Sequence, residues 1–185
     1  MSIDAAWAPH VQQDVFRILL EATAHPGRLF ELPGKQSGLH QAMALLATLV
    51  DGAVTLHDRT RSLDRRAWNF LQAEEAGPEA ARFILDRGGR TPDFTPCLGE
   101  LESPETGATL VLLVSSLGRG PLRLLLEGPG IETRQELCLD GMSPAWVQAR
   151  EGWNHAFPLG VDMYVLDDAR ICGLPRTTRI INQDR

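Results

Sequence analysis

The feature that most limits the fold of this chain is an uninterrupted apolar run at residues 108–114, ATLVLLV. Strands that have one solvated face alternate apolar and polar residues, whereas strands covered on both faces are apolar throughout. The run is far shorter than the roughly 20 residues that a membrane-spanning helix needs. We therefore expect a central strand that is buried on both faces.

Helical and strand-like patterns alternate along the rest of the chain. At residues 11–24, apolar side chains recur at steps of three and four, which places them on one helix face, and Pro26-Gly27 ends this helix. Residues 81–86 fit either a strand or a helix, and residues 88–107 are predicted to form a loop. Further helices are predicted at 39–50, at 64–75 and after a Ser143 cap, and strands at 28–32, 53–57, 122–128, 135–140, 161–167 and 169–174.

Length and composition fit one soluble domain. The chain has 185 residues, and domains commonly have about 100–200. Its 43% hydrophobic and 23% charged residues are ordinary values for a globular protein. We therefore expect an α/β fold with one domain over residues 1–185, a core at 11–181 and a mixed β-sheet flanked by helices.

Charge, the first residues and the cysteines indicate a cytoplasmic protein. The net charge of −6 and the pI of about 5.3 argue against nucleic-acid binding, which usually requires a basic excess. The N-terminal sequence MSIDAAWAPHVQQD lacks the basic start and apolar run of a signal peptide. Cys97, Cys138 and Cys172 form no C-x-x-C pair, which fits a reducing compartment. We expect neither a nucleic-acid partner nor a membrane.

No complete catalytic or metal-binding motif occurs in the sequence. The five histidines form no H-x-H or H-E-x-x-H pattern, and G-x-S-x-G is absent, so no metal site or serine nucleophile is predicted. Lys35 is the only lysine, so nearly every mechanism that requires a Schiff-base lysine is excluded. His57 and Asp58 end a predicted strand, where catalytic residues of α/β proteins often lie, although a surface pair that supports a turn is the favoured interpretation.

Two glycine-containing segments are predicted to be turns. LEGPGI (126–131) invites comparison with a phosphate cradle, which needs consecutive backbone N–H groups at the start of a helix. Pro129 has no N–H, and a strand is predicted to follow, so Gly128, Pro129 and Gly130 are interpreted as a structural turn. LGRG (117–120) is predicted to be a hairpin turn with an exposed arginine.

Aromatic residues recur near the predicted helix that follows Ser143. Trp146, Trp153 and Phe157 stand at helical spacing. Packing against the sheet is the leading interpretation, and a face between subunits is the second, because aromatic residues are enriched in the cores of interfaces.

The segment LPRTTRI near the C-terminus permits three interpretations. In an extended chain, Arg176 and Thr178 point to one side and Thr177 and Arg179 to the other. Two guanidinium groups and two hydroxyls suit a phosphate or a carboxylate. The same groups suit ion pairs across a subunit boundary or a solvated sheet edge, and the spacing alone does not decide between the three.

Five stretches, in one order along the chain, carry a resemblance to a known family. They are FRILLEATAHPG (16–27), LATLVDGAVTL (46–56), LLLEGPGI (124–131), FPLGVDMYVLD (157–167) and LPRTTRI (174–180). Together they resemble PhnH, a subunit family of the bacterial carbon–phosphorus (C–P) lyase system. The last two stretches are the most specific.

The resemblance implies a role in alkylphosphonate catabolism. PhnH proteins belong to a core complex with PhnG, PhnI and PhnJ. In an early step the ribose triphosphate moiety of ATP is transferred to methylphosphonate with release of adenine. PhnI is the expected catalytic chain of that step, with PhnG, PhnH and PhnL required, and PhnJ breaks the C–P bond later.

The resemblance also implies a fold similar to the large domain of pyridoxal-phosphate-dependent transferases, without the cofactor, and a homodimer when the chain is isolated. We therefore expect a non-catalytic assembly subunit that binds no cofactor itself. The alternative hypothesis is a small-molecule binding protein or enzyme in which Arg176 and Arg179, with His57 and Asp58, hold a phosphonate or a nucleotide.

Overall fold

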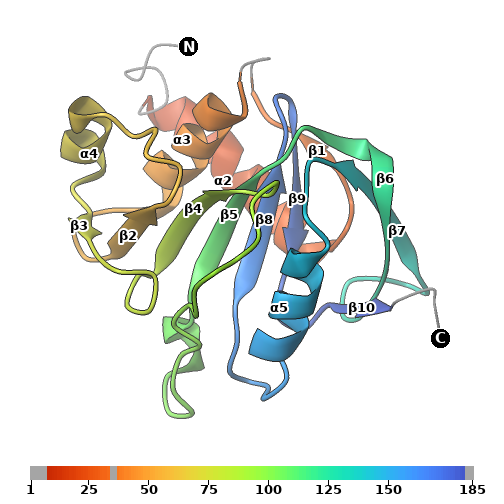
Figure 1. Cartoon of the computed structure of the whole chain (residues 1–185). Coiled ribbons are helices and arrows are strands. Elements are labelled where there is room, and N and C mark those ends of the chain that lie inside the picture. Colours follow the sequence, from red (N-terminus) through yellow and green to blue (C-terminus); the bar gives the residue numbers. More distant parts are fainter. Residues whose placement is uncertain (1–7, 34–36, 182–185) are drawn as a thin grey trace.

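A seven-stranded mixed sheet forms the centre of the computed structural model, which describes residues 8–33 and 37–181 (Figure 1). Its strand order is β1-β9-β8-β5-β4-β2-β3. The strands are β1 (Phe30–Glu31), β2 (Thr55–Asp58), β3 (Glu74–Glu75), β4 (Phe83–Arg87), β5 (Thr109–Leu113), β8 (Asp162–Leu166) and β9 (Arg170–Leu174). The predicted mixed sheet is confirmed, residues 81–86 lie largely within a strand, and Lys35 falls outside the described residues.

The directions of the strands define two edges of this sheet. Strands β3, β2, β4, β5 and β8 are parallel, whereas β9 is antiparallel to β8, and β1 to β9. The parallel strands therefore end together at one edge, here called the carboxyl edge, and begin at the opposite amino edge. The two strands predicted at 161–167 and 169–174 form a β8–β9 hairpin that turns at Asp167-Asp168 on the carboxyl edge, so β9 ends at the amino edge with Leu174 opposite Met163.

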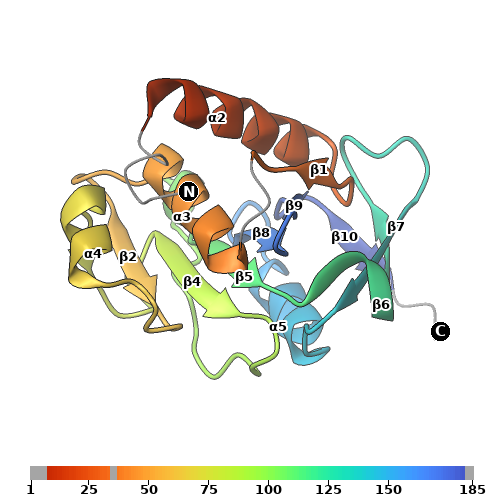
Figure 2. The ribbon, with the colours of Figure 1, turned by 90° about the horizontal axis from the view of Figure 1, so that it is seen from above.

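Strand β5 is buried on both faces, as its sequence predicts. The helices are α2 (Pro9–Ala24), α3 (Gly38–Leu49), α4 (Arg65–Leu71) and α5 (Ala145–Trp153), with a 3-10 turn at Pro104–Thr106. Val111 and Leu113 belong to the core under α2, α3 and α4, and Leu110 and Leu112 belong to the core under α5 and a second sheet (Figure 2). Within the described ranges, every helix falls short of the length and apolar character that a membrane span requires.

The second sheet corrects the turn predicted at LGRG. It is antiparallel, with the order β10-β6-β7, and its strands are β6 (Ser116–Glu127), β7 (Gln135–Asp140) and β10 (Arg179–Ile181). The chain does not reverse at LGRG but continues along β6, where Leu117 and Leu122 both lie opposite Leu139. Gly118 and Gly120 have φ values of +79° and +137°, which let the extra residues bulge out of the ladder. The hairpin turn predicted there is wrong.

Two predicted helix ends also shift. The helix predicted at 64–75 ends at Leu71, because Gln72 adopts the left-handed conformation with φ of 57°. Asp64 caps this helix and accepts a hydrogen bond from the Ala67 N–H. Helix α5 begins at Ala145 with Pro144 at its N-cap, and the hydroxyl of Ser143 accepts a 3.3 Å bond from the Ala145 N–H.

Candidate functional site

The segment after β9 turns sharply at the amino edge. The N–H of Thr178 donates to the carbonyl of Pro175 at 2.9 Å, which closes a tight turn before β10 begins. The segment is therefore not extended at this point, although burial still groups Arg176 with Thr178 and Thr177 with Arg179, as predicted. Thr177 is exposed, Thr178 is buried, and the side chain of Arg179 is 80% exposed with a carboxylate oxygen of Glu127 at 3.9 Å.

Arg176 fastens this turn to three other segments. Its backbone N–H donates to Asp162 Oδ1 at 2.7 Å, and its Nε and Nη2 donate to Asp162 Oδ2 at 3.1 and 2.7 Å. Its Nη1 donates to the carbonyls of Pro104 and Pro158 at 2.6 and 3.1 Å. Only 11% of the side chain is exposed. Because four hydrogen bonds engage a group with five N–H donors, Arg176 holds the fold rather than facing solvent.

Arg150 is a buried cation that the sequence reasoning did not select. It lies on the inner side of α5, 3% exposed, and donates to the carbonyls of Thr178, Leu174 and Pro175 at 3.0, 3.4 and 2.5 Å. Burial lowers the pKa of its guanidinium to about 10, and the charge of Asp162 opposes this shift. The helical position between Trp146 and Trp153 was the only signal for it in the sequence.

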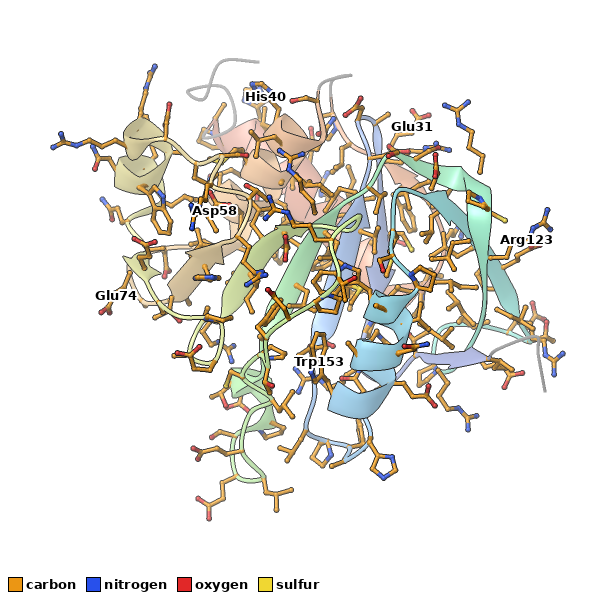
Figure 3. The ribbon with its side chains drawn as sticks, viewed as in Figure 1. Glu31, His40, Asp58, Glu74, Arg123 and Trp153 are labelled. Carbon is orange, nitrogen blue, oxygen red and sulfur yellow. The ribbon has the colours of Figure 1, made fainter. Side chains whose placement is uncertain are left out.

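His57 and Asp58 lie at the other end of the molecule. Both are near the carboxyl edge at the end of β2, where Figure 3 labels Asp58, whereas Arg176 and Arg179 follow β9 at the amino edge. The Asp58 carboxylate accepts hydrogen bonds from the N–H groups of residues 60, 62 and 63 and from the hydroxyl of residue 60. His57 Nδ1 donates to the carbonyl of Ala76 at 2.6 Å. The structure therefore does not bring the two pairs together, and Asp58 organises a turn.

The three candidate aromatic residues occupy different environments. Trp146 is fully buried and donates from Nε1 to the carbonyl of Arg90 at 2.6 Å. The rings of Trp146, Trp153 and Phe94 form a cluster with centroid separations of 5.8 to 6.3 Å. Phe157 is 66% exposed, so it is the member of the set that is free to contact a partner.

The segment LEGPGI forms a tight turn between other backbone segments. Gly128 and Gly130 have φ values of +143° and +82°, and the N–H of Ile131 donates to the carbonyl of Gly128 at 3.1 Å. A Cβ at Gly130 would lie 2.1 Å from the carbonyl oxygen of Ala24 at the end of α2. The glycines thus permit close backbone approach, and β7 rather than a helix follows.

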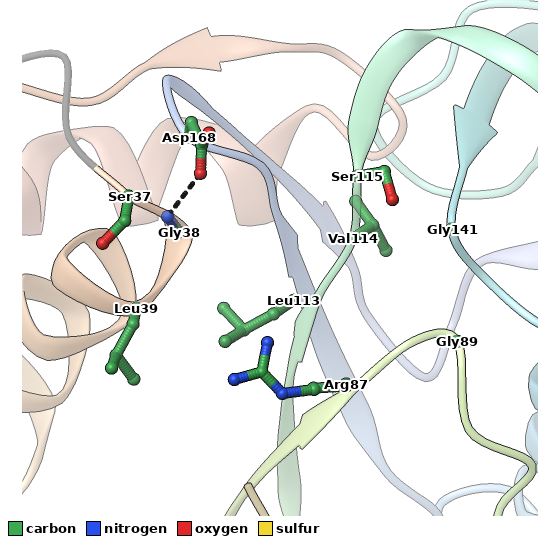
Figure 4. Close-up of a pocket in the computed structure, with 10 residues that line it drawn as sticks. All are labelled: Ser37, Gly38, Leu39, Arg87, Gly89, Leu113, Val114, Ser115, Gly141 and Asp168. Atoms are coloured by element: carbon green, nitrogen blue, oxygen red, sulfur yellow. Dashed lines mark hydrogen bonds between the residues drawn. The ribbon is translucent and has the colours of Figure 1, made fainter. Parts of the chain in front are cut away.

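A cavity of about 450 Å³ opens at the carboxyl edge (Figure 4). Ligands of open α/β sheets bind at this edge. Figure 4 shows the Arg87 guanidinium directed into the cavity, and Asp168 Oδ1 accepts a 2.7 Å bond from the Gly38 N–H at the start of α3. The lining residues are Ser37, Gly38, Leu39, Arg87, Gly89, Leu113, Val114, Ser115, Gly141 and Asp168. No pattern in the sequence predicted this site.

Asp167, next to Asp168, ties the β8–β9 hairpin to the start of β6. Its carboxylate accepts bonds of 2.7 to 2.9 Å from the N–H groups of Leu117, Ala169 and Arg170 and from the Arg170 guanidinium. Burial raises the pKa of the Asp167 carboxyl, but these donors outweigh burial and lower the pKa below its ordinary value. Among the described residues, no group of three or more His, Cys, Asp or Glu side chains is arranged to hold a metal ion.

Comparison with known proteins places this open-sheet α/β chain among the proteins of bacterial phosphonate metabolism. The sequence model of the family described as bacterial phosphonate metabolism protein (PhnH) matches residues 4–181. The chain therefore belongs to the PhnH family, as its five motif stretches predict.

Two relatives show the same relationship over nearly their whole length. A protein of Stutzerimonas stutzeri named as a C-P lyase subunit, HtxG, is 43% identical over 182 residues, which cover 96% of this chain and 91% of the relative. A Rhizobium meliloti protein named alpha-D-ribose 1-methylphosphonate 5-triphosphate synthase subunit PhnH is 26% identical over 182 residues, which cover 91% of this chain and 89% of the relative. A role in the phosphonate pathway is thereby supported.

Proposed function

We propose that this chain is a structural, non-catalytic subunit of a C–P lyase core complex. In that complex it would act with PhnG, PhnI and PhnL when the ribose triphosphate moiety of ATP is transferred to methylphosphonate and adenine is released. The names of the two relatives support the pathway, and the name of the Rhizobium meliloti relative supports the reaction. The complex would also contain PhnJ.

The observation that supports the proposal most directly is that the Arg176 side chain forms its hydrogen bonds within the chain. The two stretches that most resemble the family, FPLG (157–160) and LPRTTRI (174–180), contact each other through this side chain, which binds Asp162 and the carbonyl of Pro158. A polar motif whose hydrogen-bond donors bind groups of its own chain stabilises the fold of that chain. It leaves Arg176 few donors for a ligand, so the alternative in which Arg176 and Arg179 grip a phosphonate or nucleotide has less support.

The proposal includes several further properties. The chain would be cytoplasmic, would form a homodimer when isolated, and would bind no cofactor of its own. Likeness to the large domain of pyridoxal-phosphate-dependent transferases stays a prediction, and the lysine that such a cofactor would need, Lys35, lies outside the described residues.

Phe157 offers a direct test of the assembly role. It is 66% exposed in the loop after α5, and an aspartate at that position would face solvent in the isolated chain. If Phe157 packs into a partner subunit, the Phe157→Asp chain should keep the wild-type melting temperature but recover about tenfold less of the other subunits. The measurement is affinity purification of the full tagged chain from cells grown on methylphosphonate, followed by quantitative mass spectrometry.

The matched control is Phe16→Asp, because Phe16 is exposed on α2 at the opposite face of the sheet. It should recover the wild-type amount of PhnG, PhnI and PhnJ. Wild-type recovery with Phe157→Asp would remove Phe157 from the interface, and absence of these subunits from the wild-type preparation would contradict the assembly role itself.

A further inference from the structure

Two buried polar atoms near the C-terminal segment lack a hydrogen-bond partner in the described part of the chain. They are Nε of Arg150 and Oγ1 of Thr178, and the two residues are only 3% and 1% exposed. Arg150 Nη1 bonds the carbonyl of Thr178 at 3.0 Å, so the guanidinium and Thr178 are neighbours. Buried donors are normally satisfied, and both of these groups are able to donate.

Among the described residues, no carboxylate is in direct contact with the Arg150 guanidinium. Asp162, whose charge also acts on Arg150, pairs with the Arg176 guanidinium at 2.7 Å. The three hydrogen-bond partners of Arg150 are neutral carbonyl oxygens. A buried charge is costly unless a counter-ion accompanies it. Within the described chain, the buried charge of Arg150 is therefore compensated only by Asp162, without a direct contact.

A cavity of about 300 Å³ adjoins both features. Arg150 and Thr178 form part of its wall, and the exposed His155 and Arg179 lie at its rim, with Glu151 as the acidic residue there. A water molecule occupies about 30 Å³ in the liquid, so the cavity has room for a group larger than one water.

We propose that this cavity binds a small phosphorus oxyanion, such as a phosphonate or a phosphate group. Arg150 Nε and the Thr178 hydroxyl would donate to its oxygens, Arg179 would add positive charge at the entrance, and the His155 ring would offer an N–H donor there. Both donors are covered in this structure, so the rim side chains must change rotamer to admit the anion, as is common on binding. The inference goes beyond the assembly role and does not depend on it.

Replacement of Thr178 by valine separates binding from folding. The two side chains have nearly the same shape, and the hydroxyl has no partner in the described protein. Without an anion, Thr178→Val should therefore melt at or above the wild-type temperature, because a buried unsatisfied hydroxyl destabilises the folded state. A lower melting temperature would show that the hydroxyl has a protein partner and would overturn the proposal.

The experiment is calorimetric titration and thermal unfolding of the full chain with methylphosphonate, inorganic phosphate, acetate and chloride at constant ionic strength. At about ten times the dissociation constant, methylphosphonate or phosphate should raise the wild-type melting temperature by about 3–5 °C. Thr178→Val should bind it about tenfold more weakly, and Arg179→Ala should also bind more weakly.

Arg123→Ala is the matched control for Arg179→Ala, because Arg123 is exposed on β6 and has one ion pair with Glu136 (Figure 3). It should bind like the wild type. The tighter of methylphosphonate and phosphate identifies the source of the group. Equal binding by chloride or acetate, unchanged affinity in Thr178→Val, or no binding of either phosphorus oxyanion would overturn the site. None of these results bears on whether the chain joins the complex.

Discussion

Replacing Arg176 with alanine should lower the free energy of unfolding by about 3 kcal/mol. The change removes a largely buried guanidinium and leaves Asp162 Oδ2 and two backbone carbonyls, those of Pro104 and Pro158, without the donors it supplied. Breaking a buried ion pair from one side costs about 3–5 kcal/mol, and the lower end applies because Asp162 is partly exposed. For a chain of this length the melting temperature should fall by about 6–12 °C.

Arg179→Ala is the control for this prediction, because it removes the same charge three residues away. Arg179 is 80% exposed and 3.9 Å from its acidic neighbour, and exposed pairs of this kind contribute about 0–1 kcal/mol. Thermal and urea unfolding of the two variants should therefore differ clearly. Equal stability of the two variants would contradict the conclusion that the hydrogen bonds of Arg176 stabilise the fold.

Replacing Gly130 with alanine should destabilise the chain by about 3 kcal/mol or more. A left-handed residue other than glycine costs about 1–2 kcal/mol, and Gly130 has φ of +82°. In addition, the new Cβ would lie 2.1 Å from the carbonyl oxygen of Ala24, so the end of α2 would have to move. The measurement is the midpoint of urea unfolding at constant slope.

Gly152→Ala is the control with the opposite expected sign. Gly152 lies in α5 with open space around its Cα, and alanine is more favourable than glycine in a helix by up to about 1 kcal/mol. If Gly152→Ala is more stable than the wild type and the stability of Gly130→Ala is unchanged, the turn after β6 is not conformationally restricted.

The sheet was the most predictable part of this molecule, because its signal is local. The apolar run at 108–114 required burial on both faces, and β5 shows it. The hairpin turn predicted at LGRG was wrong because glycine permits a turn and a bulge equally. The choice between them depended on the pairing of β6 with Leu139 of β7, which is not encoded near the glycines.

The candidate sites were less predictable, because distant segments build them. Arg176 is hydrogen-bonded to residues 14 to 72 positions away. The LPRTTRI motif alone therefore did not show whether this arginine stabilises the fold or binds a ligand. Arg150 belongs to no sequence motif, and its importance follows from its burial and from its hydrogen bonds to three carbonyls of residues 174–178. The cavity at the carboxyl edge joins the start of α3, the ends of β4 and β5 and the β8–β9 hairpin, which no local pattern connects.

The most direct test of the structural role is the release of adenine from ATP in the presence of methylphosphonate, measured with purified subunits. The full chain alone should release none, and adding it to PhnG, PhnI and PhnL should restore a reaction that those three subunits do not perform without it. Adenine release by the chain alone, or an undiminished reaction in its absence, would contradict the proposed role.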